Sequence, residues 1–190
     1  MKLTSKRIFD FLLSLILILL LLLPSFFIAV AIRLTSKGPA IHFSDRVGKD
    51  NIIFKMPKFR TMMIDTPPIA THLLVNPTSY VTTLGSFLRK YSLDEIPQLL
   101  SILFGQMTFV GPRPALFNQR DLIKMRNKAG ISALCPGLTG WAQVNGRDNL
   151  DLNQKVELEI EYMQRQSFLF DLKILWITFL RVLNKQGVSH

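Results

Sequence analysis

Two adjacent carboxylates, Asp94 and Glu95, are the residues of this chain best suited to chemistry on phosphate groups. Apolar residues recur after them at helical spacing as far as Gly105, so we expect the pair at the start of a helix that ends there. Carboxylates bind Mg²⁺ through oxygen and also act as nucleophiles toward phosphorus. A structural interpretation stays open, because Ser92 and Glu95 have capping-box spacing and acidic residues suit a first helical turn.

Arginine recurs in short motifs beside proline, glycine or an aromatic residue. The motifs are Lys58-Phe59-Arg60-Thr61-Met62, Pro112-Arg113-Pro114 and Asn145-Gly146-Arg147. The planar guanidinium group matches two phosphate oxygens at once, and a restricted backbone lowers the entropy cost of the contact. For each motif taken alone, a solvated surface charge is the open alternative.

Other common chemistries find little support in this sequence. It contains no P-loop and no Rossmann fingerprint, so a standard nucleotide-binding fold is not expected. His42, His72 and His190 are scattered, with no second histidine or cysteine at metal-ligand spacing. Cys135 is the one cysteine, and we expect a packed small residue rather than a nucleophile.

A charge-free apolar run from Phe11 to Ile32 is broken by Pro24 and Ser25 and has basic residues outside both ends. At ~1.5 Å per residue, such a helix can cover a hydrocarbon core of ~30 Å. Pro24 lacks an amide hydrogen and clashes with the carbonyl of Leu20, and basic flanks favour the cytoplasmic side for both ends. A re-entrant helix satisfies these features. A kinked spanning helix and a cleaved signal peptide are the alternatives, although the run exceeds the usual signal-peptide core.

The remaining sequence suits one compact domain close to a membrane. We predict a membrane helix with its flanks over residues 1–36 and a cytoplasmic catalytic domain, mostly α with minor β, over residues 37–190. The formal net charge of +10 suits anionic lipid headgroups or phosphorylated substrates as well as nucleic acid.

Several local elements are predicted within that domain. We expect a short strand at 52–54, helices near 84–91 and 118–127, and a rigid non-helical turn at 111–114. Asp151 or Asn153 is predicted to cap a helix ending near Gln166, and Asp171 another over 172–184. The last helix carries Trp176 on a broad apolar face, which suits a membrane interface, with burial in a core as the alternative.

Five motifs occurring in order resemble the bacterial sugar transferase family, the monotopic polyprenyl-phosphate phosphoglycosyl transferases. They are Ser44-Asp45-Arg46-Val47-Gly48, Lys58-Phe59-Arg60-Thr61-Met62, Ser92-Leu93-Asp94-Glu95-Ile96-Pro97-Gln98, Val110-Gly111-Pro112-Arg113-Pro114 and Pro136-Gly137-Leu138-Thr139-Gly140-Trp141-Ala142-Gln143-Val144-Asn145-Gly146-Arg147. The similarity covers nearly the whole chain, and the short length resembles the small PglC-like members.

The resemblance implies an enzyme at the cytoplasmic face of the bacterial inner membrane, held by a re-entrant helix and interfacial amphipathic helices. Its reaction moves a sugar-1-phosphate from a UDP-sugar, here expected to be an N-acetylated amino sugar, to undecaprenyl or another polyprenyl phosphate. UMP is released, and the product enters bacterial glycoconjugate biosynthesis. The expected partners are the donor, the lipid acceptor and membrane lipids, without nucleic acid.

The resemblance also implies roles for individual residues. Asp94 is expected to be the nucleophile that carries the phospho-sugar and to hold Mg²⁺, with Glu95 assisting. Residues expected to bind phosphate and uridine diphosphate are Lys58, Arg60, Arg89, Arg113 and Arg147.

Two other classes of function remain open at this point. A metal-dependent phosphohydrolase would release sugar phosphate without a lipid acceptor. A membrane-anchored binder of anionic lipid or polyanions would bind in a salt-sensitive way and release no UMP.

Overall fold

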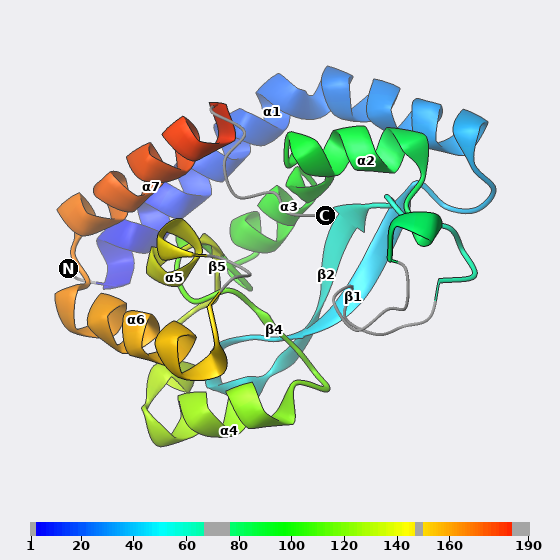
Figure 1. The fold of residues 1–190 in the computed structure, drawn as a ribbon. Coiled ribbons are helices and arrows are strands. Elements are labelled where there is room, and N and C mark those ends of the chain that lie inside the picture. Colours follow the sequence, from blue (N-terminus) through cyan, green and yellow to red (C-terminus); the bar gives the residue numbers. More distant parts are fainter. Residues whose placement is uncertain (1–2, 67–76, 147–149, 184–190) are drawn as a thin grey trace.

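The structure is a computed structural model that describes residues 3–66, 77–146 and 150–183, and it is mostly helical with two small sheets, as predicted (Figure 1). In chain order the elements are α1 (Leu3–Thr35), β1 (Ile41–Val47), η1 (Lys49–Asn51), β2 (Ile53–Phe59), η3 (Pro77–Tyr80), α2 (Thr83–Lys90), η4 (Leu93–Glu95), α3 (Gln98–Leu103), β3 (Thr108–Val110), β4 (Ala115–Leu116), α4 (Arg120–Lys128), η5 (Ile131–Ala133), β5 (Gly137–Thr139), α5 (Trp141–Asn145), α6 (Leu152–Arg165) and α7 (Phe168–Leu183).

The apolar run forms one long helix, α1, that continues through Pro24. The helical backbone is therefore not interrupted at Pro24 and Ser25, and a change of direction of the membrane helix at these residues stays a prediction. Proline removes one backbone hydrogen bond and bends a helix, and here the residues on both sides keep their helical geometry. By length and composition, the segment Ser5–Thr35 could cross a membrane.

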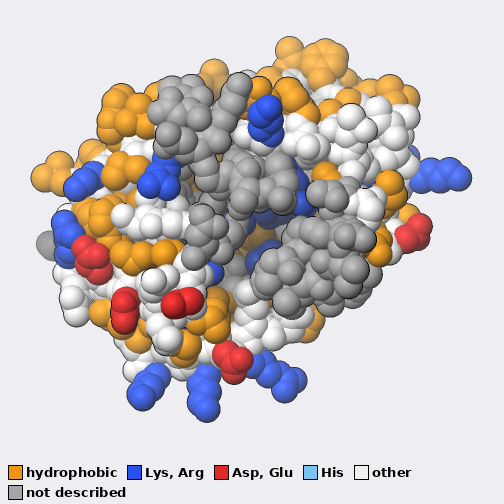
Figure 2. Space-filling model, in the orientation of Figure 1, with side chains coloured by type: hydrophobic (Ala, Val, Ile, Leu, Met, Phe, Trp, Pro, Cys, Tyr) orange, Lys and Arg blue, Asp and Glu red, His pale blue; other side chains and the backbone are white. Residues whose placement is uncertain are grey.

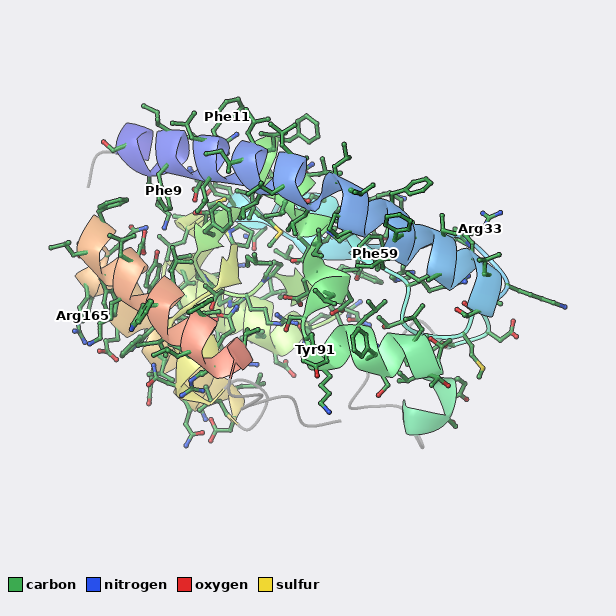
Figure 3. The ribbon with its side chains drawn as sticks, turned by 90° about the horizontal axis from the view of Figure 1, so that it is seen from above. Phe9, Phe11, Arg33, Phe59, Tyr91 and Arg165 are labelled. Carbon is green, nitrogen blue, oxygen red and sulfur yellow. The ribbon has the colours of Figure 1, made fainter. Side chains whose placement is uncertain are left out.

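Helix α1 lies along the domain instead of projecting from it. It passes over α3 at the upper edge of the molecule in Figure 1. In Figure 3, Phe9 points toward the rest of the domain and Phe11 points away from it. Phe9 meets Phe168 edge to face, and near the other end Ile32 packs with Phe59 and Leu88. The opposite side of α1 presents exposed apolar residues: Leu19, Leu20, Leu22, Leu23, Phe26, Phe27, Val30 and Leu34.

A β-hairpin follows α1. Strands β1 and β2 pair antiparallel from Ile41–Phe59 to Val47–Ile53, and β4 adds to the outer side of β1. The predicted strand at 52–54 is thus the start of a longer one. Strand β2 is an edge strand, which is where its Pro57 can be accommodated.

A second, two-stranded sheet positions the proline-rich turn. Strands β3 and β5 run parallel, and Gly111 and Gly137 approach closely just after β3 and at the start of β5. A Cβ on Gly137 would lie 2.1 Å from the amide nitrogen of Gly111, so only glycine fits there. The segment 111–114 leaves β3 without helical structure, as predicted.

The helices predicted near 84–91 and 118–127 are confirmed as α2 and α4. The helix predicted to begin at Asp94 and Glu95 and to end at Gly105 is present as α3, which begins later, at Gln98. Gly105 follows α3 with φ +82°, the left-handed conformation that ends a helix without strain in glycine. Asp151 caps α6 in a reciprocal capping box with Gln154, which confirms the first of the two predicted caps.

The predicted cap at Asp171 is wrong, because α7 begins at Phe168 and Asp171 lies inside its first turn. Its buried carboxylate instead accepts hydrogen bonds from Lys6 and Tyr162. The apolar residues of α7 fall into a buried group and an exposed group. Ile174 is fully buried, whereas Leu169, Leu172, Trp176 and Phe179 are exposed.

Candidate active site

Asp94 and Glu95 lie in a short 3-10 turn, η4, between α2 and α3. Ser92, which precedes the turn, has φ +55° and its side chain makes no capping hydrogen bond. The capping-box interpretation of this segment is therefore wrong. Because Ser92 has a left-handed backbone conformation, the chain turns sharply between α2 and η4.

Glu95 lies at the centre of a group of cations that come from three separate elements. Its Oε1 is 2.9 Å from Lys58 Nζ, on β2, and 3.5 Å from a terminal nitrogen of Arg113, in the turn after β3. Arg46, on β1, donates a hydrogen bond to the carbonyl of Pro114, beside Arg113. Burial and the charge of Arg113 lower the pKa of Arg46 to about 10, and the charge of Glu95 opposes that shift.

Asp94 is nearly buried, with 8% of its surface exposed. Burial raises the pKa of its carboxyl group and adjacent Glu95 adds to the effect, whereas Lys58 and Arg89 oppose it. A carboxylate that is partly stripped of water is more basic and a stronger nucleophile than one in solution.

Arg89 joins the same site from α2. Its Nε donates to Thr61 Oγ1 at 2.9 Å, which holds the side chain beside the end of β2. Burial lowers the pKa of Arg89, and the charge of Asp94 counteracts the effect. Asp94 and Glu95 are thus surrounded by four cations: Lys58, Arg89, Arg113 and Arg46. Figure 2 shows Lys and Arg side chains inside a hollow on one face of the molecule. Such a site can bind a strongly anionic ligand such as a diphosphate.

Of the predicted phosphate-binding residues, Lys58, Arg89 and Arg113 are brought to the carboxylate pair, whereas Arg60 is not. Arg60 is buried and its terminal nitrogens donate to the carbonyls of Ser36 and Lys37, just after α1. This arginine holds the end of α1, which differs from its predicted role. Arg147 falls outside the described residues.

Arg46 was not among the predicted site residues. The signal for it was the motif Ser44-Asp45-Arg46-Val47-Gly48, which supported the resemblance without being assigned a role. Only the pairing of β1 with both β2 and β4 brings Arg46 toward Glu95 and Arg113.

The donor set at this site fits magnesium when a phosphorylated ligand is bound. Across residues 3–66, 77–146 and 150–183 there is no group of three or more histidine, cysteine or acidic side chains that could hold a metal ion. Mg²⁺ usually binds through one or two carboxylates together with substrate phosphates and water, so the oxygens of Asp94 and Glu95 suffice in number.

Cys135 behaves as the sequence predicts. Its sulfur packs near the carbonyls of Gly105 and Gln106, and burial raises its pKa to about 11. A thiol that stays protonated at neutral pH is a poor nucleophile.

Comparison with known proteins agrees with the geometry. A family model described as bacterial sugar transferase matches residues 1–185. The uncharacterized sugar transferase EpsL of Bacillus subtilis is 36% identical over 185 residues, which cover 97% of this chain and 90% of EpsL. The exopolysaccharide production protein ExoY of Sinorhizobium fredii is 36% identical, over 96% of this chain and 87% of ExoY.

A longer relative carries a more specific name. The UDP-glucose:undecaprenyl-phosphate glucose-1-phosphate transferase of Escherichia coli is 38% identical over 91% of this chain, which spans 39% of that enzyme's length. The match over almost all of this sequence confirms the family expected from the five motifs: the chain belongs to the bacterial sugar transferase family.

Proposed function

We propose that this protein transfers a sugar-1-phosphate from a UDP-sugar to a polyprenyl phosphate such as undecaprenyl phosphate, and releases UMP. The observation that supports this most directly is the nearly buried Asp94, which lies next to Glu95 among Lys58, Arg89 and Arg113. A nucleophilic carboxylate in a cationic, phosphate-binding site suits transfer of a phosphoryl group.

The reaction proceeds in two halves. An oxygen of Asp94 forms a bond to the sugar-bearing phosphorus of the donor, and the bond from that phosphorus to the bridging oxygen breaks, so that UMP leaves with the electron pair. An oxygen of the polyprenyl phosphate then attacks the same phosphorus, and Asp94 leaves as a carboxylate. The UDP-sugar and the polyprenyl phosphate, both anions, therefore never occupy the site together, which avoids their mutual repulsion.

The cations have separate tasks in this scheme. Lys58 and Arg113 hold Glu95 and would contact the diphosphate, and Arg89 would act on the Asp94 side. Mg²⁺ held by Asp94, with Glu95 beside it, would offset phosphate charge on the donor and the leaving group. Treatment with EDTA is expected to stop UMP release, and added Mg²⁺ to restore it; activity that persists in EDTA would contradict the metal's role.

The packing of α1 supports a monotopic membrane arrangement. Near its first turns, Lys6 bonds to Asp171 and Arg7 donates to the last carbonyls of α3; just past its end, Ser36 is held by Arg60. Both ends of the helix are thus fastened to one folded domain. A helix that crossed the bilayer would carry one end away from that domain, so we propose that α1 enters one leaflet and returns.

Exposed apolar side chains would then face lipid. They lie along α1 and on α7, where Trp176 is 61% exposed, and they would place the active site at headgroup depth, where a polyprenyl phosphate presents its charge. Labelling of Lys2→Cys and Lys37→Cys with a membrane-impermeant thiol reagent tests the path. Labelling from the same side supports the re-entrant helix, and labelling from opposite sides would overturn it.

The covalent intermediate gives the sharpest test of the proposed function. Protein incubated with a UDP-sugar and Mg²⁺, without acceptor, is expected to gain the mass of one sugar phosphate on the peptide containing Asp94. Asp94→Asn should gain none and release no UMP. Addition of polyprenyl phosphate should remove the mass from the native protein. UMP release without either lipid dependence or an adduct would indicate a phosphohydrolase instead.

The sugar itself is proposed from resemblance alone. We expect an N-acetylated amino sugar, whereas the Escherichia coli relative is named for glucose. A panel of UDP-sugars assayed for UMP release distinguishes the two. Faster release from UDP-glucose than from every UDP-N-acetylated sugar would overturn our expectation.

A further inference from the structure

Gln98 has a buried side chain whose amide nitrogen is unpaired. Only 3% of the residue's surface is exposed, and Nε2 has no hydrogen-bond partner within the part of the chain that the structure describes. A buried donor without a partner costs free energy, because it gives up its bonds to water and receives nothing in exchange. Such a group is explained if its partner is a ligand that is not part of the protein.

The position of Gln98 points to the identity of that ligand. The residues between η4 and α3, Ile96 and Pro97, both have right-handed helical backbone angles. Gln98 therefore follows Asp94 by four positions and Glu95 by three, which are the spacings at which side chains are neighbours on a helical surface. Strand β2, which carries Lys58, packs against both η4 and α3.

We propose that Gln98 donates a hydrogen bond from Nε2 to a phosphoryl oxygen of the sugar phosphate while that phosphorus is attacked by Asp94. This inference rests on the proposed function and adds a residue to it. A neutral donor suits this position, because it stabilises charge that develops on the phosphoryl oxygens without forming an ion pair with the nucleophile. The amide would be satisfied only when the donor or the phospho-sugar is bound.

Helix α3 offers a matched control. Ser101 is 1% exposed and its Oγ is likewise without a partner among the described residues, but it lies seven positions from Asp94, about two turns away. Ser101 therefore shares the unpaired burial of Gln98 without its proximity to the nucleophile.

The experiment compares Gln98→Met, Gln98→Glu and Ser101→Ala in the full-length protein. Two quantities are measured: the melting temperature without substrates, and the single-turnover rate of UMP release with donor and Mg²⁺. Gln98→Met keeps the side-chain size and removes the unpaired donor, so we expect an equal or higher melting temperature together with a rate about 10- to 100-fold lower. Ser101→Ala should also keep or raise the melting temperature and leave the rate unchanged.

Gln98→Glu supplies a second measurement, the pH dependence of the rate, which would not change if Gln98 had only a structural role. Its carboxylate would repel the phosphoryl oxygens, so the rate should fall further than in Gln98→Met. The ratio of this rate to the native rate at the same pH should recover in part as the pH is lowered and the new carboxyl group is protonated. A Gln98→Met rate equal to that of the native protein would overturn the proposal. So would a lower melting temperature in Gln98→Met with a rate loss matched by Ser101→Ala. If the native protein releases no UMP at all, the proposed function itself fails.

Discussion

Lys6 Nζ lies 2.6 Å from Asp171 Oδ2, so the first turns of the membrane helix are joined to α7 across almost the whole sequence. The same ammonium group donates to the hydroxyl of Tyr162 and to the carbonyl of Val110. Val110 ends β3, directly before the turn that carries Arg113. The anchor of α1 and the turn that carries Arg113 therefore share one buried polar cluster.

Removal of one partner from this cluster should destabilise the fold strongly. Lys6→Met leaves the Asp171 carboxylate buried without its cation, which costs about 3–5 kcal/mol and lowers the melting temperature by about 10 °C for a chain of this size. Thermal unfolding in detergent measures the effect. Lys124→Met, an exposed lysine on α4, is the control and should change it little. Equal behaviour of the two variants would contradict a structural role for Lys6.

Lys58 should set the pH dependence of the first half-reaction. Its charge lowers the pKa of Asp94 against the larger raising effect of burial, so Lys58→Met should raise that pKa further. The acid limb of the pH–rate profile is then expected to move to higher pH, because Asp94 must be ionised to attack. Lys55→Met, on the same strand but exposed, should leave the limb in place. If the acid limb of Lys58→Met stayed at the native pH, the charge of Lys58 would not control the ionisation of Asp94.

Asp94→Asn should stabilise the fold while it abolishes turnover. Because the pKa of Asp94 is raised in the folded protein, ionisation of this group favours the unfolded chain. The penalty is absent while both states are protonated, develops as pH rises above the ordinary value of 3.8, and is complete above the folded pKa. The gain in melting temperature should therefore grow as the pH rises above about 4 and level off above the folded-state pKa of Asp94. Asp45→Asn, an exposed carboxylate on β1, should show no such trend; a pH-independent gain in Asp94→Asn would contradict the assigned shift.

Arg60 and Arg113 should separate stability from activity. Arg60→Met deprives the carbonyls of Ser36 and Lys37 of their buried donor, so it should lower the melting temperature and leave the single-turnover rate nearly unchanged at a temperature where the variant is folded. Arg113→Met, at a partly exposed arginine, should lower the rate about tenfold or more with little change in melting temperature. The reverse pattern would exchange the roles assigned to these two arginines.

Much of the local structure follows from short stretches of sequence. The apolar run predicts α1, Asp151 predicts the start of α6, and Gly105 predicts the end of α3. Each of these depends on contacts within a few residues, where backbone geometry and side-chain capping decide the outcome. The five motifs likewise indicated the family and the pair Asp94 and Glu95, because each motif is a contiguous stretch of residues that can be recognised without the fold.

Contacts between distant residues were decided only by the tertiary structure. Asp171 has the sequence features of a cap, but packing of α7 against α1 buries it beside Lys6. Lys58 lies on β2 and Arg60 lies just past its end, yet the first meets Glu95 and the second meets the end of α1. The sequence by itself determined which groups could do the chemistry, whereas the tertiary structure decided which of them meet, because burial and pairing depend on elements that are far apart along the chain.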